Sequence, residues 1–138
     1  MKPLPSFLVA VLLCGCVSTN AALVDPSVHL ARTCKSAIKL YTTPDRVTHP
    51  YREVAVLNAK GESNWSDEED MIESMRDKAA EIGANGIILS GIDEPSALTK
   101  VIGQVAKTGS QRKGKALAIY VPSDATNTAT ACANAQKK

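Results

Sequence analysis

The chain has 138 residues, of which 16 are Lys or Arg and 14 are Asp or Glu, so its formal net charge is only +2. This near balance argues against nucleic acid binding, because DNA and RNA partners require a basic field that releases counterions. Aromatic residues make up 4% of the chain, so the core must be aliphatic, and the length fits one domain.

The first fifteen residues have the pattern of an export signal. Lys2 supplies a positive charge, and an apolar run over 7–13 follows it. This run is far shorter than the ~20 apolar residues that a membrane-spanning helix needs. We therefore expect residues 1–15 to be a signal peptide that is removed from the mature protein.

The end of this run, Leu13-Cys14-Gly15-Cys16, resembles the lipobox of bacterial lipoproteins, with Cys14 where Ala, Ser or Thr is usual. The resemblance implies cleavage before Cys16, lipid on the sulfur and amine of Cys16, and a stable membrane anchor, because each buried CH₂ contributes ~0.8 kcal/mol. Val17 stands where Asp would favour the inner membrane, which implies the outer membrane and a periplasmic orientation. The alternative is an ordinary secretory signal cleaved near Asn20-Ala21-Ala22.

Two cysteines remain after Cys14 is removed and Cys16 is lipidated, namely Cys34 and Cys132. In an oxidising periplasm such a pair predicts a disulfide. The disulfide would close a long loop and stabilise the fold by up to ~4 kcal/mol. A metal pair and a nucleophilic thiol are the competing interpretations, although the chain has no Cys-x-x-Cys spacing and Cys34 has no neighbouring His.

The small, polar and mixed composition of residues 16–33 predicts a membrane tether. A single domain then spans 34–138. Alternating apolar residues predict its first strand over 35–41 and its second over 51–57, with a loop containing two prolines between them.

The next segment is expected to be a helix that begins at Ser66, with Glu69 completing a capping box. The acidic run 67–70 fits the positive end of the helix dipole, and apolar residues then recur at helical spacing. Gly83 is expected to end the helix in a left-handed conformation. A strand over 86–92 follows.

Strand, helix and strand in this order predict a βαβ unit with parallel strands and a right-handed crossover. Apolar spacing indicates a further helix over 97–106, followed by a polar loop over 108–115 and a strand over 116–121. Ser123 is expected to cap an Ala-rich final helix that turns Cys132 inward. The predicted fold class is α/β (α+β), a small mixed sheet of about four strands with helices packed on it.

Residues 75–89, read MRDKAAEIGANGIIL, resemble a pattern in small envelope lipoproteins of Gram-negative bacteria whose function is uncharacterised. In that group a helix ends in Lys-Ala-Ala-Glu-Leu-Gly-Ala-Asn or a close variant, and a strand follows at once; residues 50–54 resemble the same group. The stress-sensing lipoprotein of the Rcs phosphorelay has a similar but more distant domain, and its cysteine pattern is not visible here. The resemblance covers roughly residues 35–122 and implies a small α/β domain without catalytic residues.

No motif for catalysis or metal binding is complete. Residues 109–116 nearly match a phosphate-binding P-loop, but Ala116 offers no hydroxyl for Mg²⁺ and the loop precedes a strand. The acidic run 67–70 lacks the ligand spacing of a Ca²⁺ loop. His29 and His49 have no partner at ligand spacing. We therefore expect no metal, no cofactor and no enzymatic activity.

Trp65 and Tyr51 are the candidate interface residues, because aromatic side chains dominate binding hot spots. The competing interpretation makes Trp65 a lid on the core. The sequence favours a non-catalytic outer-membrane lipoprotein that binds another protein or helps to maintain the envelope. The alternative is a small-ligand or peptide-binding sensor module, which a deep pocket with convergent polar groups would favour.

Overall fold

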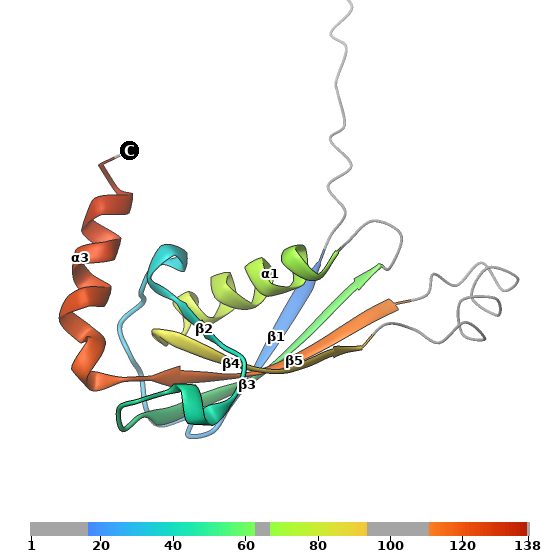
Figure 1. Ribbon diagram of the computed structural model, residues 1–138, viewed down its shortest axis with the longest axis horizontal. Helices are drawn as coiled ribbons and strands as arrows, with labels where there is room; N and C mark the ends of the chain where they lie inside the picture. The colour runs from blue at the N-terminus through green and yellow to red at the C-terminus, as the bar shows by residue number, and fades with distance from the viewer. Residues whose placement is uncertain (1–16, 63–66, 94–110, 138) are drawn as a thin grey trace, which may run out of the picture.

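The computed structural model describes residues 17–62, 67–93 and 111–137 (Figure 1). It confirms the predicted α/β class, with a five-stranded mixed sheet and a C-terminal helix. The strands lie in the order β1-β3-β5-β4-β2. The elements are β1 (Ser18–Leu23), η1 (Lys35–Ala37), β2 (Lys39–Tyr41), η2 (Pro44–Arg46), β3 (Arg52–Glu62), α1 (Glu68–Glu81), β4 (Gly86–Asp93), β5 (Gln111–Tyr120), η3 (Pro122–Asp124) and α3 (Ala125–Ala135).

The predicted βαβ unit is present in a split form. Strands β3 and β4 both run antiparallel to β5, so they point in the same direction as expected. However, β5 lies between them. The parallel pair that shares hydrogen bonds is β2 with β4.

The prediction of a tether over 16–33 needs correction for residues 18–23, which form edge strand β1. This strand pairs antiparallel with β3, from Ser18 opposite Lys60 to Leu23 opposite Ala55. Strand β3 continues to Glu62, past the predicted end at 57, and so provides the edge on which β1 pairs. The Thr19 hydroxyl also hydrogen-bonds with the Ser74 hydroxyl of α1 at 2.7 Å.

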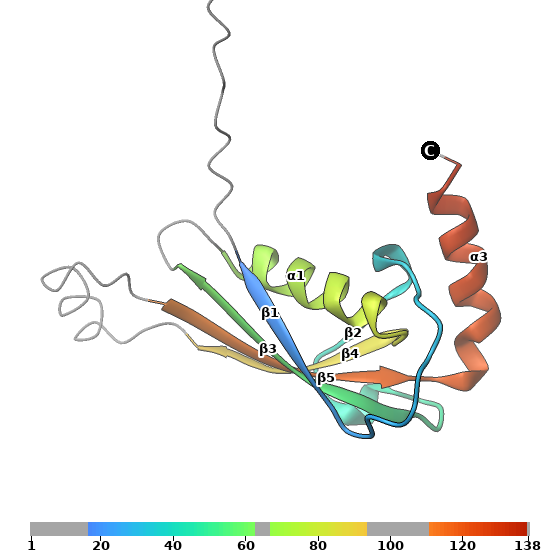
Figure 2. The same ribbon diagram turned by 180° about the vertical axis from the view of Figure 1, so that it is seen from behind.

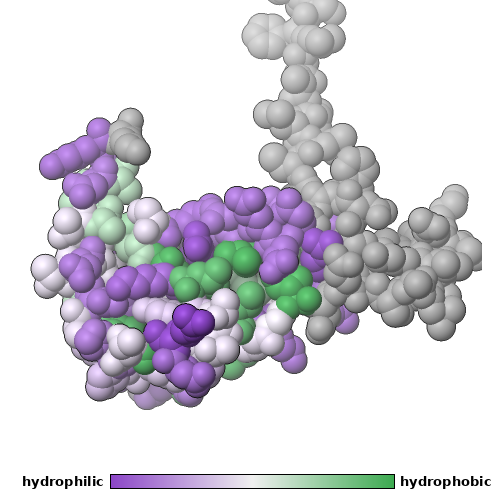
Figure 3. All heavy atoms as spheres, viewed as in Figure 1, coloured by the Kyte–Doolittle hydropathy of each residue, from purple (hydrophilic) through white to green (hydrophobic). Residues whose placement is uncertain are grey.

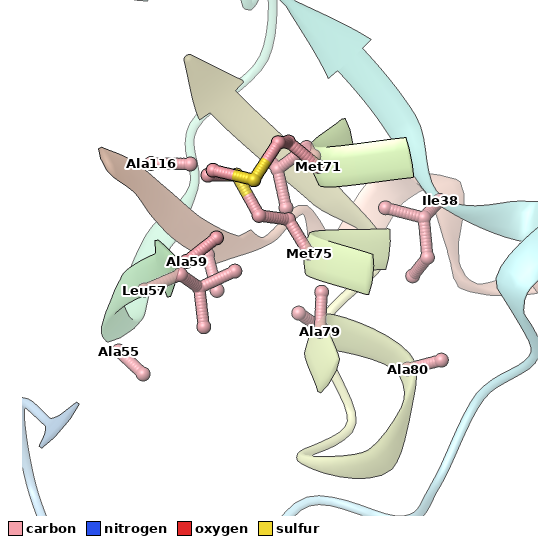
Figure 4. Close-up of a cluster of buried hydrophobic side chains, with 12 residues drawn as sticks. Ile38, Ala55, Leu57, Ala59, Met71, Met75, Ala79, Ala80 and Ala116 are labelled. Carbon is pink, nitrogen blue, oxygen red and sulfur yellow. The ribbon is translucent and has the colours of Figure 1, made fainter. Parts of the chain in front are cut away.

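Helix α1 packs along one face of the sheet and forms the main core (Figures 1 and 4). Met71 and Met75 point down from the helix toward Leu57, and all three side chains are fully buried. The strands below carry small residues, which allow the helix to lie close to the sheet. The fully or almost fully buried alanines of these strands are Ala55, Ala59, Ala116 and Ala118.

The predicted C-terminal end of α1 is confirmed, whereas its predicted N-cap is displaced by one residue. The N-cap is Asp67, whose side chain accepts a hydrogen bond from the Asp70 N–H at 2.9 Å, while Asp70 accepts one from the Asp67 N–H at 3.2 Å. The predicted Ser66–Glu69 box is therefore displaced by one residue, because Asp is an equally good cap; Ser66 itself lies outside the described residues. Gly83 has φ of +84°, which confirms its predicted left-handed conformation.

Other predicted boundaries also move. Residues 35–37 form η1, so the first predicted strand shortens to β2. Strand β5 begins at Gln111, within the predicted loop 108–115, because it pairs with β3 along its whole length. Ser123 lies in η3, and Asp124 occupies the N-cap position of α3 without a side-chain cap hydrogen bond. The predicted helix over 97–106 lies outside the described residues.

Candidate functional site

A disulfide joins Cys34 to Cys132, with an S–S distance of 2.10 Å and a Cα–Cα distance of 5.5 Å. This confirms the pairing predicted from the compartment and the cysteine count. The two residues are 98 positions apart, and the bond ties the segment before η1 to helix α3. The attachment of α3 is therefore the feature from which we build the site.

Cys34 lies on a segment that is pinned to the end of α1. The Thr33 N–H donates to the Ala80 carbonyl at 2.9 Å, and the Thr33 hydroxyl donates to the Ala84 carbonyl at 2.6 Å. Carbonyls at the end of a helix lack intrahelical donors and need such partners. Gly83 permits this contact, because a Cβ atom there would overlap the Leu30 side chain.

Lys35 fixes η1 to the side of α1. Its Nζ lies 2.8 Å from Glu73 Oε2 and 3.2 Å from Asp77 Oδ2. The hydrogen bond to Glu73 raises the pKa of Lys35, and the same bond lowers the pKa of Glu73. Both directions agree, so the pair favours the charged state of each partner and holds η1 beside the disulfide.

Helix α3 contributes no buried residue. It stands beyond the end of the sheet, to one side of α1 (Figures 1 and 2), and its contacts are mainly with η1 and η3. Apart from the disulfide, an ion pair holds its base, where Lys39 Nζ lies 2.7 Å from Asp124 Oδ2. The helix is thus positioned by a covalent bond and a salt bridge rather than by a core.

An open cavity of about 250 Å³ lies between α3 and the segment 30–33. Its apolar lining includes Leu30, Ala31, Gly83, Tyr120, Ala125 and Ala129. Two polar groups at the cavity are already used within the protein, since the Thr33 hydroxyl donates to Ala84 and the Thr128 hydroxyl to the Asp124 carbonyl at 2.9 Å. Arg32 also lines the cavity and Tyr120 carries a hydroxyl group, so the cavity offers few polar groups beyond these two, although a small-molecule site needs several that converge.

Tyr51, the other predicted site residue that the structure describes, does not lie at α3. Tyr51 is half-buried and packs with Ile88, Ile119 and Val121 in a second cluster on the opposite face of the sheet. Trp65 and Cys16 lie outside the described residues. Within the three described segments, no group of three His, Cys, Asp or Glu side chains could hold a metal ion.

Thr33 and Lys35 have no local sequence signal that would mark them. Thr33 meets Ala84 across 51 positions, and Lys35 meets Asp77 across 42. Cys34, which lies between these two residues, does stand out in the sequence, because the compartment of a protein constrains whether its cysteines pair.

No protein-family model matches the chain, and no curated protein matches it. One similar solved structure is the crystal structure of a Francisella virulence factor, FvfA. The two share a TM-score of 0.50 and 15% sequence identity, over 74% of this chain and 96% of FvfA. At this identity the likeness shows a common fold alone. Among the described helices, none is long and apolar enough to cross a membrane.

Proposed function

We propose that this protein is a non-catalytic lipoprotein, anchored through Cys16 to the periplasmic side of the outer membrane, that uses α3 to bind another envelope protein. The observation that carries the proposal is that α3 buries no side chain of its own and is nevertheless fixed by a disulfide. A helix that adds nothing to the core is explained by the surface that it presents.

The composition of α3 supports this role. The helix has eleven residues, reads ATNTATACANA and carries no charge. A helix this short is marginal in isolation even when it is rich in Ala. Its fixation by the disulfide reduces the ordering entropy that binding would otherwise require.

The position of α3 relative to the start of β1 supports the same proposal. Strand β1 begins at Ser18, and α3 stands at the other end of the sheet (Figures 1 and 2). If the lipid is on Cys16, the membrane lies beside the start of β1. Helix α3 then lies at the far end of the sheet from the anchor, where a periplasmic or envelope protein can reach it.

Site-specific photocrosslinking in intact envelopes tests this proposal. A photoreactive residue at Thr130 or Asn134, both exposed on α3, should give a discrete crosslinked product. The same residue at Thr42, exposed in the loop before η2, is the matched control and should give none. Cys34→Ser should reduce the product from α3. Equal products from α3 and Thr42, or none from α3, would contradict the proposal.

A peptide-binding role is the second candidate, and the outer edge of β4 favours it. Strand β2 pairs with β4 only as far as Ile88, so within the described residues the rest of β4 has no strand on that side. Leu89 and Ile92 there, with Leu40 and Ile72 nearby, are only partly buried, and Figure 3 shows apolar atoms at the surface below α1. An extended peptide can add to such an edge. Crosslinks from exposed Ser90, rather than from α3, would favour this candidate.

A further inference from the structure

Among the described residues, no α-helix covers one face of the sheet. Alternation in β3 places Val56, Asn58 and Lys60 on the face that turns away from α1, and alternation in β5 places Lys113 and Lys115 there. Figure 2 shows α1 on the opposite side. We call this surface the open face, defined by Val56, Asn58, Lys60, Lys113, Lys115 and Leu117.

The described residues cover one half of the open face. The half near the start of β1 has no described residue packed on it. Toward the other end, Val47 and Tyr51 pack against Ile88 and Ile119. In the uncovered half, Val56 is 41% exposed, which is high for a Val in a central strand.

The uncovered half carries three lysines without an ion pair to any described residue. Lys60 lies directly opposite Lys113 in the β3–β5 register, and Lys115 lies opposite Asn58. Like charges opposite each other in a sheet are unfavourable. Glu62 shares this face at the end of β3, and Asp93 lies opposite Lys113 in the β4–β5 register, so the three lysines outnumber the two carboxylates. Such an arrangement is explained if an anion outside the protein neutralises the lysines.

Other described lysines behave differently. Lys35, Lys39 and Lys78 each form an ion pair within the protein. The lysines that lack one are therefore concentrated on the open face, with Lys137 near the C-terminus as the remaining example.

The start of β1 lies at the same place. Ser18 pairs with Lys60, and neighbouring strands are about 4.8 Å apart. Residue 16 is covalently within about 7 Å of Ser18, because each residue spans at most about 3.5 Å. A lipid on Cys16 thus leaves no linker to hold β1 away from the membrane. Lys60 then lies within about 12 Å of residue 16 and Lys113 within about 17 Å, which is one to two Debye lengths of about 8 Å.

The opposite side of this end is acidic. The first turn of α1 carries Glu68, Glu69 and Asp70, all exposed, on the helix side of the sheet. An anionic surface would repel this side and attract the open face, so the charges select one orientation.

We propose that the open face rests on an anionic phospholipid surface, with Lys60, Lys113 and Lys115 at the headgroups. This inference rests on the proposed lipid anchor at Cys16, which provides the proximity. It deepens the proposed function, because a domain held in this orientation directs α3 away from the membrane.

The test uses the full lipidated protein in vesicles of neutral phosphatidylcholine or of phosphatidylcholine with phosphatidylglycerol. Amines are acylated to low extent, and mass spectrometry gives the rate at each lysine. On anionic vesicles, Lys60, Lys113 and Lys115 should react at least about threefold more slowly than on neutral vesicles. Salt at about 1 M, where the Debye length is about 3 Å, should abolish this difference in rate. Lys137 should react equally on both. Equal rates at the three lysines would overturn the inference.

A variant sharpens this test. Lys60→Gln should bring the rates of Lys113 and Lys115 closer to their values on neutral vesicles, because each basic residue at an anionic surface strengthens association about fivefold. Lys137→Gln is the matched control and should change neither rate. Protection that persists unchanged in Lys60→Gln would contradict the assigned surface.

The same material separates the two proposals. An intact mass without acyl chains, and a protein that does not float with neutral vesicles, would overturn the anchor at Cys16. A protein that carries acyl chains on Cys16 and floats with both vesicle types would support the anchor. If its lysines nevertheless react equally on the two vesicle types, only the open-face inference is overturned.

Discussion

At the scale of single residues, Asn85 is the polar side chain that the core depends on. It is 3% exposed, its Nδ2 donates to the Val121 carbonyl at 2.9 Å, and its Oδ1 accepts from the Val121 N–H at 2.7 Å. Its backbone N–H donates to the Ile119 carbonyl, and its carbonyl accepts from the Lys39 N–H. One residue therefore joins the turn after α1 to β5 and β2.

We predict that Asn85→Ala lowers the free energy of unfolding by about 2 kcal/mol, because both polar backbone groups of Val121 lose a buried partner. Urea unfolding followed by circular dichroism measures this change. Asn20→Ala, at an exposed position of β1, is the control and should change stability by less than about 0.5 kcal/mol. An Asn85→Ala midpoint equal to that of the control would show that the two hydrogen bonds contribute nothing.

Substitutions at Gly83 and Gly91 distinguish the cost of backbone strain from the cost of steric overlap. Gly83 has φ of +84°, and a Cβ there would meet the Leu30 side chain and lie 2.7 Å from the Ala31 carbonyl; Gly91 has φ of +145° with nothing within 4 Å. Both alanine variants should be strained, by about 1–2 kcal/mol for a left-handed residue. We predict that Gly83→Ala is the more destabilising in urea. If Gly91→Ala were the more destabilising variant, residues 30–31 would have to move away from the new Cβ at little cost in free energy.

The Lys39–Asp124 ion pair gives a prediction about pH. The hydrogen bond from Lys39 holds the pKa of Asp124 below its usual range. Because the folded-state pKa is depressed, the stabilisation is present above the unfolded value of about 3.9 and is lost as pH falls through the folded value. Lys39 is half exposed, so the effect should be at most about 1 kcal/mol. Asp124→Asn should be less stable than the parent at pH 7, and the urea midpoints should converge as pH falls through the lowered pKa of Asp124. A difference independent of pH would exclude the ion pair as its cause.

At the scale of elements, the sequence predicted best where a local rule applies. The helix over 68–81 has a charged first turn, helical apolar spacing and a glycine at its end, and all three features act within a few residues. Strand β1 has no such rule, because its small residues STNAAL become a strand only through pairing with β3. The role of Asn85 beyond its turn likewise depends on a residue 36 positions away.

The attachment of α3 gives the prediction at this scale. Cys34→Ser should free the Cys132 thiol and raise amide hydrogen exchange across 125–135, while β5 stays protected, because α3 has no buried side chain to hold it. The double variant with Cys132→Ser should exchange like the single one. Uptake of an alkylating reagent by both cysteines of the parent protein in periplasm-derived material would show that the bond does not form there. Unchanged exchange in α3 would show that the contacts with η1 and η3 suffice.

At the scale of the whole molecule, the sheet order could not be predicted from the sequence. A strand–helix–strand pattern fixes the direction of β3 and β4, but not the insertion of β5 between them. The order has a functional consequence, because β1, β3 and β5 bring Ser18, Lys60 and Lys113 into one row across the sheet. The disulfide, in contrast, could be predicted, because the cysteine count and the oxidising compartment expected from the signal sequence constrain it without knowledge of the fold.

The anchor itself gives the last prediction. The segment Leu13 to Cys16 resembles a lipobox, and β1 starts two residues later, so a lipid on Cys16 would join directly to the folded domain. Cys16→Ser should abolish incorporation of a palmitate analogue and leave an uncleaved or unlipidated precursor, while Cys14→Ser, matched in chemistry, should keep the label because Ser is usual at that position of a lipobox. Metabolic labelling followed by immunoprecipitation measures both variants. Equal label on Cys16→Ser and the parent would rule out the anchor, and with it the reason for placing the lysines of the open face at a membrane.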